Sequence, residues 1–174
     1  MEIYTDGSVF KKKYGNIGGI GVFFGDNDER NLSEPFFLSK TTSPRCELFA
    51  IIRAIQVFMA HNNVIKMSKE YKLTIYSDNQ YAVYAMTKWI FGWQKRGWKK
   101  SNGKEIENPD LIKWLFNLKM FLDKYITFEL KWVRAHRKGK DVPKKGTKEY
   151  QHFYGNDEAD KLAKRGSSYL GKTI

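Results

Sequence analysis

The chain has 174 residues, 41% hydrophobic and 29% charged, so it is expected to fold as an ordinary globular domain rather than remain disordered. Its net charge of +12 favours a polyanionic partner such as nucleic acid. The single cysteine excludes an internal disulfide framework. The sequence shows no secretory signal and no apolar run long enough to cross a membrane. Together with the single cysteine, this favours a soluble, intracellular and most simply cytoplasmic protein.

Three strands are predicted first, at residues 1–6, 18–24 and 31–39, and they are near enough in sequence to form an antiparallel meander. A helix is expected next, with Ser43 as N-cap and Pro44 at the first helical position. Apolar residues then recur at helical spacing as far as Phe58. A short apolar strand at 73–77 and a helix from about residue 79 complete this half.

A basic segment follows, and Asn108-Pro109 then repeats the pattern of a cap and a proline at the start of a helix. Residues 126–132 alternate between apolar and polar side chains and predict a strand. A last helix is expected from about residue 156 to a C-terminal cap at Gly166. The resulting order, βββαβα, basic segment, αβα, predicts an α/β protein in which helices flank a mixed sheet.

A few acidic residues fall at positions where chemistry is common: Asp6, Glu47, Asp78, Asp157 and Asp160. Asp6 and Asp78 are expected to end strands, and ligands gather at the carboxyl ends of strands in α/β sheets. Each acid also has a structural explanation, as part of a turn, as a helix cap or as a favourable charge near a helix N-terminus. Clustered in a basic protein, they instead predict a site for Mg²⁺ or Mn²⁺. No Cys/His set has the spacing of a zinc site.

Five motifs occur in the order found in the type 1 ribonuclease H family, which the chain resembles from residue 3 to about 165. They are YTDGS (4–8), RCEL (45–48), YSDNQY (76–81), WVRAH (132–136) and NDEADKLA (156–163). The resemblance implies the ribonuclease H-like fold, a five-stranded mixed sheet flanked by helices, as one catalytic domain over residues 1–174. It also implies an endonuclease that hydrolyses the RNA strand of RNA–DNA hybrids and leaves 5′-phosphate and 3′-hydroxyl ends.

The resemblance further assigns roles to the acids. Asp6, Glu47, Asp78 and Asp160, rather than Asp157, match the carboxylates that hold two Mg²⁺ ions, for which Mn²⁺ is an alternative. Asp6 is expected to bridge the ions, with Asp160 on the side of the attacking water and the other two acids on the leaving-group side. His136 matches a histidine that carries a proton or assists product release.

The basic handle, about residues 88–108, resembles the family's protrusion that grips the DNA strand. From residue 88 to 104 it holds six Lys or Arg and no acid. Tryptophans among cations suit a nucleic-acid backbone, although packing of these tryptophans into the core is the ordinary alternative. The resemblance assigns DNA contacts to seven residues: Tyr81, Trp89 and Trp93 around a deoxyribose, Lys40, Thr42 and Asn108 around a phosphate, and Ser101 on the backbone.

The chain departs from the family pattern in three places. Ser43 and Pro44 replace two amide residues that contact RNA 2′-hydroxyls, so recognition of the RNA must differ in detail. A basic loop insertion is expected at about 137–155, and no hybrid-binding domain is expected ahead of the first motif. Three alternatives stay open: a resolvase- or integrase-like nuclease, the ribonuclease H domain of a reverse transcriptase, and a hybrid-binding module without catalysis. A monomer is expected.

Overall fold

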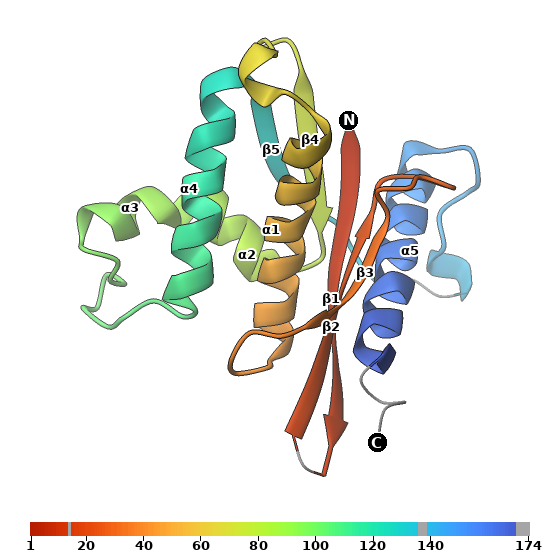
Figure 1. Ribbon diagram of the computed structural model, residues 1–174, viewed down its shortest axis with the longest axis horizontal. Helices are drawn as coiled ribbons and strands as arrows, with labels where there is room; N and C mark the ends of the chain where they lie inside the picture. The colour runs from red at the N-terminus through yellow and green to blue at the C-terminus, as the bar shows by residue number, and fades with distance from the viewer. Residues whose placement is uncertain (14, 136–138, 170–174) are drawn as a thin grey trace.

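The computed structural model describes residues 1–13, 15–135 and 139–169 of the chain (Figure 1). Its described residues form one five-stranded sheet in the order β3-β2-β1-β4-β5. The strands are β1 (Glu2–Lys12), β2 (Gly15–Phe23), β3 (Leu32–Phe36), β4 (Lys72–Ser77) and β5 (Thr127–Trp132). The first three strands pair antiparallel, whereas β1, β4 and β5 run parallel. The predicted meander and mixed sheet are therefore confirmed.

Helices cover both faces of this sheet. They are α1 (Ser43–His61), α2 (Gln80–Tyr84), α3 (Ile90–Lys95), α4 (Pro109–Tyr125) and α5 (Lys148–Tyr169), with a π-helical turn at Ala85–Trp89 and short 3₁₀ turns at Val64–Lys66 and Gly139–Asp141. Figure 1 shows α1 and α4 on one side of the sheet and α5 on the other. In the described part of the chain, none of the helices combines the length and the apolar character that a bilayer span requires.

The main core lies between the sheet and the pair α1 and α4, where apolar residues of α1 such as Leu48 and Ile55 pack on Ile3 and Ile75. On the opposite face a smaller apolar cluster lies under α5 and includes Tyr4, Tyr76 and Ala159. Because both faces are covered, the interior strand β4 is buried over nearly its whole length.

Two glycines of β2 let α5 approach the sheet closely. A Cβ atom at Gly19 would lie 2.2 Å from the carbonyl oxygen of Ala163, and one at Gly21 would lie 2.1 Å from that of Ala159. No side chain fits in that space. The glycines therefore fix the position of α5, and with it the position of Asp160, relative to β1.

The first strand is longer than predicted. Asp6 was expected to end it, but β1 continues to Lys12 as one arm of a long hairpin with β2. The parallel pairing with β4, in contrast, ends at Thr5 and Ser77. Asp6 therefore lies in the middle of its own strand, at the point where the neighbouring strand stops, and so still lies at the carboxyl edge of the parallel part of the sheet.

Of the two caps predicted next to a proline, the one at Ser43 is wrong, whereas the one at Asn108 is confirmed in position but makes no side-chain cap. Helix α1 has Thr42, not Ser43, at the N-cap position, and its carbonyl oxygen accepts the N–H groups of Arg45 and Cys46. Asn108 does precede α4, but its backbone is left-handed, with φ of 50°, and its side chain caps no N–H group of the helix. Pro44 and Pro109 mark the starts of α1 and α4 correctly, whereas the capping chemistry depends on the preceding turn.

The last helix begins much earlier than residue 156. The hydroxyl oxygen of Thr147 accepts the N–H of Tyr150 at 3.1 Å, which caps α5 at its true start. Residues 148–155 of the predicted loop insertion are therefore helical. Asp157 and Asp160 lie in the middle of α5 rather than in its first turns. Gly166 does not end the helix either, because α5 continues past it against the backbone of Glu34.

Candidate active site

Three carboxylates meet at the carboxyl edge of the parallel strands. Asp6, Glu47 and Asp78 each offer an oxygen atom, and these atoms all lie within 4.8 Å of one another. Asp6 comes from β1, Asp78 directly follows β4, and Glu47 lies near the start of α1. Gly7 makes this approach possible, because a Cβ atom there would lie 2.3 Å from the backbone nitrogen of Glu47.

The cluster is electrostatically unfavourable without a cation. Burial raises the pKa of Asp6 well above its ordinary value, and the charges of Asp78 and Asp160 raise it further. Burial likewise raises the pKa of Glu47 to about 7, although the hydroxyl of Ser43 donates to this carboxylate at 2.9 Å and opposes the shift. Crowded oxygen donors of this kind match Mg²⁺ or Mn²⁺, so the residues fit the metal that the sequence predicts.

The fourth predicted ligand, Asp160, faces the cluster from α5 but already has a cationic partner. Lys164 donates to its carboxylate at 2.5 Å, one helical turn away. Asp160 is not among the three residues within 4.8 Å of one another, although its charge contributes to the raised pKa of Asp6. The expectation that all four acids converge is therefore met by three of them. Lys164 was missed, and its spacing of four residues from Asp160 was the available signal.

Asn79 organises the cluster from the adjacent position. Its side-chain oxygen accepts the N–H of Ala82 at 2.9 Å and caps α2, so the cap of this helix is Asn79 and not Asp78. Asn79 also lies beside Glu47 and lowers the pKa of its carboxyl group, which favours the charged form. The indole of Trp132 donates to the backbone carbonyl of Asp78 at 3.1 Å and so ties this turn to β5.

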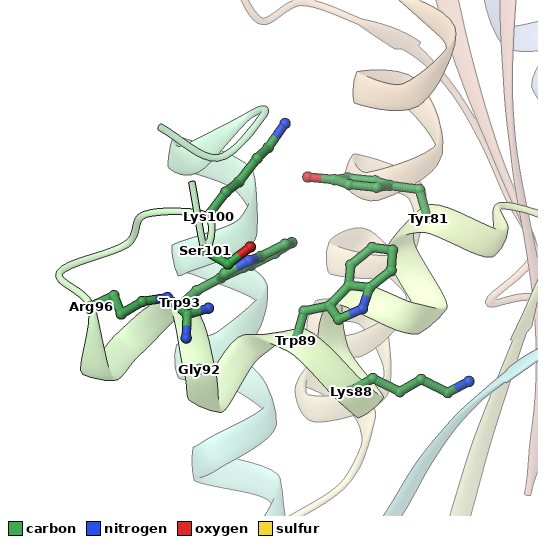
Figure 2. Close-up of a pocket in the computed structure, with 8 residues that line it drawn as sticks. All are labelled: Tyr81, Lys88, Trp89, Gly92, Trp93, Arg96, Lys100 and Ser101. Carbon is green, nitrogen blue, oxygen red and sulfur yellow. The ribbon is translucent and has the colours of Figure 1, made fainter. Parts of the chain in front are cut away.

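Four of the predicted DNA contacts line a single cavity of about 450 Å³, namely Tyr81, Trp89, Trp93 and Ser101. The ring centroids lie 5.9 Å apart for Tyr81 and Trp89, and 5.6 Å apart for Trp89 and Trp93. Figure 2 shows the three rings around a common space, with Ser101 beside Trp93. Trp93 is only 6% exposed and belongs to the core, whereas Trp89 is 40% exposed. Packing into the core therefore explains Trp93 but does not explain Trp89.

Cations surround this aromatic cavity. Lys88, Arg96 and Lys100 line it as well. The sequence placed these cations in the basic handle but did not indicate which of them lie beside the aromatic rings. The handle is folded rather than extended, since Lys100 pairs with Glu107 at 2.9 Å and Trp98 packs edge-on against Phe116 of α4. An aromatic floor with a positive rim is the composition that binds single nucleic-acid strands.

Arg45 joins the two segments that hold the predicted phosphate contacts. Its buried guanidinium donates to both carboxylate oxygens of Asp110, at 2.9 and 2.6 Å, and to the carbonyl oxygen of Ser39 at 3.0 Å. It also reaches the side-chain oxygen of Asn108 at 3.4 Å. Lys40 and Thr42 follow Ser39 closely, so Arg45 sets their position relative to Asn108. Sequence reasoning used Arg45 only as part of a motif and missed this structural role.

His136 lies outside the described residues, so the structure places no atom of the predicted proton carrier. Ser43 and Pro44 do lie at the start of α1, where the sequence puts them. The Ser43 hydroxyl is used within the protein, on Glu47. It is therefore already engaged at the position where the family pattern has an RNA-binding amide.

The raised pKa of Glu47 predicts how the stability of the metal-free protein depends on pH. Because the pKa in the fold is about 7 and the ordinary value is 4.5, the fold favours the protonated form. Stability in EDTA should therefore be highest below pH 4.5 on account of this group, and decrease as the pH rises to about 7. Adding Mg²⁺ should raise the melting temperature by roughly 5 °C more at pH 8 than at pH 5.

Differential scanning fluorimetry with and without EDTA measures this dependence. Glu47→Gln should flatten the EDTA profile, because the amide does not titrate. The assignment would be contradicted if, in EDTA, the wild-type protein lost more stability toward acid than toward pH 7 and Glu47→Gln abolished that loss.

Comparison with known proteins gives one family. The sequence profile of the family described as RNase H matches residues 1–168. A ribonuclease H of Mannheimia succiniciproducens is 37% identical over 171 residues, which cover 96% of this chain and 87% of that protein. A ribonuclease H of Schizosaccharomyces pombe is 34% identical over 95% of this chain, which spans only 52% of that longer protein.

Solved structures agree on the fold. The solution structure of the PFV RNase H domain superposes with a TM-score of 0.62 at 22% identity, over 95% of this chain and 93% of that one. At that identity the likeness concerns the fold alone. The five-stranded order and its flanking helices are therefore those of the RNase H-like fold.

Proposed function

The chain belongs to the type 1 ribonuclease H family and cleaves the RNA strand of RNA–DNA hybrids, and we propose that Asp6, Glu47 and Asp78 form the centre of its active site. The observation that carries this proposal is the convergence of three carboxylates within 4.8 Å, two of which have raised pKa values. Structural ion pairs relieve charge, whereas this arrangement concentrates it, which is typical of a site that binds cations.

We infer that the site holds two Mg²⁺ ions, with Mn²⁺ as an alternative. Asp6 would be shared, Glu47 and Asp78 would hold one ion, and Asp160 would hold the other. Bound divalent ions would supply charge neutralisation at the scissile phosphate and a more acidic water. Hydrolysis of that kind leaves a 5′-phosphate and a 3′-hydroxyl.

The chain's own groups prepare the site for this chemistry. The N–H of Gly7 donates to Asp6 at 2.8 Å, and the hydroxyl of Ser43 donates to Glu47 at 2.9 Å, so these carboxylates are held in one orientation. Lys164 keeps Asp160 oriented and compensates its charge. We assign His136 the proton transfer or product-release role that its motif implies.

We assign binding of the DNA strand to residues outside the acidic cluster. The aromatic cavity, lined by Tyr81, Trp89, Trp93 and Ser101, would take a deoxyribose and its phosphate, with support from the rim cations. Lys40, Thr42 and Asn108, joined by Arg45, would take a second phosphate of the same strand. We propose that the chain acts inside the cell as a monomer with one catalytic domain, for which its free, buried Cys46 is a supporting feature.

A cleavage assay tests the proposed function. The purified chain should cut a labelled RNA–DNA hybrid with Mg²⁺ or Mn²⁺ and lose this activity in EDTA. Duplex RNA, duplex DNA and a four-way junction in the same assay separate it from a resolvase- or integrase-like nuclease. Binding of the hybrid without cleavage under both metals would leave only a non-catalytic hybrid-binding module.

The basic handle predicts a separate result. Replacing Lys95, Arg96, Lys99 and Lys100 with alanine should weaken hybrid binding and make it less sensitive to salt. The slope of log affinity against log salt concentration should fall by about one for each phosphate that the variant no longer binds. Because these residues belong to the basic handle and not to the acidic cluster, kcat should change little. Fluorescence anisotropy across a salt series measures the slope, and an unchanged slope would contradict the assignment.

A further inference from the structure

Three rings form a layer beside the acidic cluster, between the sheet and the start of α5. They belong to Tyr4 of β1, Tyr76 of β4 and His152 of α5, and we call them the aromatic layer. The tyrosine rings stack with centroids 5.0 Å apart, and the imidazole lies 4.3 Å from the ring of Tyr76. The Nδ1 atom of His152 is 3.0 Å from the hydroxyl oxygen of Tyr4. Neither the proposed metal site nor the proposed DNA contacts use these side chains.

The aromatic layer directly precedes the acids along the chain elements that carry them. On β1, Tyr4 and Asp6 are two residues apart and share a face of the strand. On α5, Asp160 follows His152 by two steps of four residues and lies on the same side of the helix. The helix runs along the strand in close contact, since a Cβ atom at Gly155 would lie 2.4 Å from the ring of Tyr4. The contact of His152 with Tyr4 therefore also holds α5 along β1, toward the acids.

The first two turns of α5 have few other contacts with the sheet side. The hydroxyl of Tyr154 donates to Asp26 at 2.6 Å, and its ring packs edge-on against Phe23. Figure 1 shows these turns at the same end of the molecule as the N-terminus of the chain. Terminal turns of a helix open locally at low cost, so each contact counts there. Tyrosine hydroxyls keep their charge near neutral pH, whereas an imidazole gains or loses a proton in that range.

The surroundings of His152 favour the neutral ring. Burial lowers its pKa from the ordinary 6.5, the charge of Glu2 opposes this shift, and the ammonium groups of Lys148 and Lys131 add to it. The titratable and charged groups around the ring are Glu2 and Tyr4 of β1, Tyr76 of β4, Glu129 and Lys131 of β5, and Lys148 of α5.

The sign of the pH dependence follows from this lowered pKa. The unfolded chain binds the proton more readily than the fold, so the stabilisation by neutral His152 is complete above pH 6.5. It is lost as the pH falls through the lower pKa of the folded protein. Protonation also changes the contact with Tyr4. A ring with no proton on Nδ1 accepts the tyrosine hydroxyl, whereas the imidazolium has N–H groups on both nitrogens and accepts nothing.

We propose that His152 is a pH-sensitive positioning residue for α5. In its neutral form it holds the first two turns of the helix on Tyr4 and Tyr76, and so keeps Asp160 level with Asp6. In its charged form it releases those turns, and the carboxylate of Asp160 is placed less firmly. The release itself is independent of the proposed function, whereas its effect on the metal site rests on that function.

Hydrogen exchange at the amide groups of residues 149–156 measures the release directly. Exchange is followed in Mg²⁺ between about pH 5 and pH 8 and corrected for the intrinsic rate at each pH. In the wild type, local opening should increase toward acid by up to about tenfold per pH unit, the limit for uptake of one proton. His152→Phe keeps a ring that packs on Tyr76 but does not titrate, so its opening should not depend on pH. His61→Phe is the control, because His61 is exposed at the end of α1, and it should behave as the wild type.

Two further variants test the charges around the ring. Glu2→Gln keeps an oxygen for the hydroxyl of Tyr76 but removes the charge that favours imidazolium, so opening should shift to lower pH. Lys148→Gln removes a charge that disfavours imidazolium, so opening should shift to higher pH. Loss of contacts alone would not move the transition in opposite directions. This pair also decides the question if His152→Phe fails to fold.

The Mg²⁺ concentration for half-maximal cleavage is the second readout. It should rise toward acid in wild type and in His152→Phe, because protons compete for Asp6 and Glu47, whose pKa values are raised. The rise should be larger in the wild type by about fivefold, the lower end of ordinary coupling between sites.

Several results would overturn the proposal. One is exchange at these amides that does not depend on pH in the wild type, or depends on it equally in His152→Phe. Shifts of the same sign for Glu2→Gln and Lys148→Gln are another. An equal rise in the Mg²⁺ requirement of wild type and His152→Phe would refute the positioning of Asp160. Failure of the proposed function would be seen separately, as absence of hybrid cleavage by the wild type at neutral pH, and would leave the exchange data unaffected.

Discussion

Replacing Asp6 with asparagine is expected to lower hybrid cleavage by more than about a hundredfold, because loss of a group that only supports a metal ligand already costs roughly 10- to 100-fold. The amide keeps the shape of the side chain, and the N–H of Gly7 can still donate to its oxygen. What disappears is the negative charge at the centre of the cluster. Hybrid binding should survive or tighten, since one source of repulsion toward phosphate is removed.

The same substitution should raise stability in EDTA at neutral pH. Burial and the neighbouring acids raise the pKa of Asp6 in the fold, so ionisation of this group opposes folding above its ordinary pKa. Steady-state cleavage, hybrid anisotropy and thermal melts together test the prediction. Asp157→Asn is the matched control, because Asp157 pairs with Lys161 at 2.8 Å and lies one turn before Asp160. Cleavage by Asp6→Asn within a few-fold of wild type would refute the assignment of the metal site.

Replacing Gly21 with alanine should destabilise the fold by about 3 kcal/mol, at the upper end of ordinary overpacking. Its Cβ atom would lie 2.1 Å from the carbonyl oxygen of Ala159 and 2.5 Å from the backbone nitrogen of Ala163. Both atoms belong to the backbone of α5, so no rotamer change relieves the contact and the helix must move. A melting temperature lower by roughly 10 °C is expected. Because Asp160 lies next to Ala159, the Mg²⁺ concentration needed for half-maximal cleavage should also rise.

Gly92→Ala provides the contrast. A Cβ atom there would lie 3.1 Å from the mobile end of the Arg96 side chain, and Gly92 is inside α3, where alanine is the better helix former. Its melting temperature should stay the same or rise slightly. A loss of stability for Gly21→Ala no greater than for Gly92→Ala would show that α5 does not rest on β2 as described.

Local patterns were sufficient for much of the fold. Pro44 and Pro109 marked the starts of their helices, and the alternation that ends at Trp132 marked β5, because these signals depend on neighbouring residues alone. The Asp6, Glu47 and Asp78 cluster followed from the motifs together with the expectation that parallel strands end at one edge. Its assembly needed only the order of elements, which the sequence predicted correctly.

What the sequence could not predict depends on contacts between distant residues. The length of β1 beyond Asp6 follows from its pairing with β2. The early start of α5 was missed for a local reason: Tyr150, Phe153 and Tyr154 recur at helical spacing behind the Thr147 cap, and this signal was not used. The role of Arg45 exists only because Asp110 is folded against it from another helix. Pattern reasoning identifies residue types and their spacing, whereas these roles come from tertiary packing.

The continuity of β1 has a consequence for which sequence changes this enzyme can accept. One strand carries Asp6 of the acidic cluster and, farther along, Phe10 and Lys12 on the same face, and it pairs with β2 from Tyr4 to Lys12. Insertion or deletion of one residue between them would turn every later side chain to the opposite face of the sheet. Changes of two residues would keep the face and move these later side chains by ~7 Å along the strand. Relatives that keep the same side chains on this face should therefore differ in length here by even numbers of residues, or carry a bulge that restores the alternation.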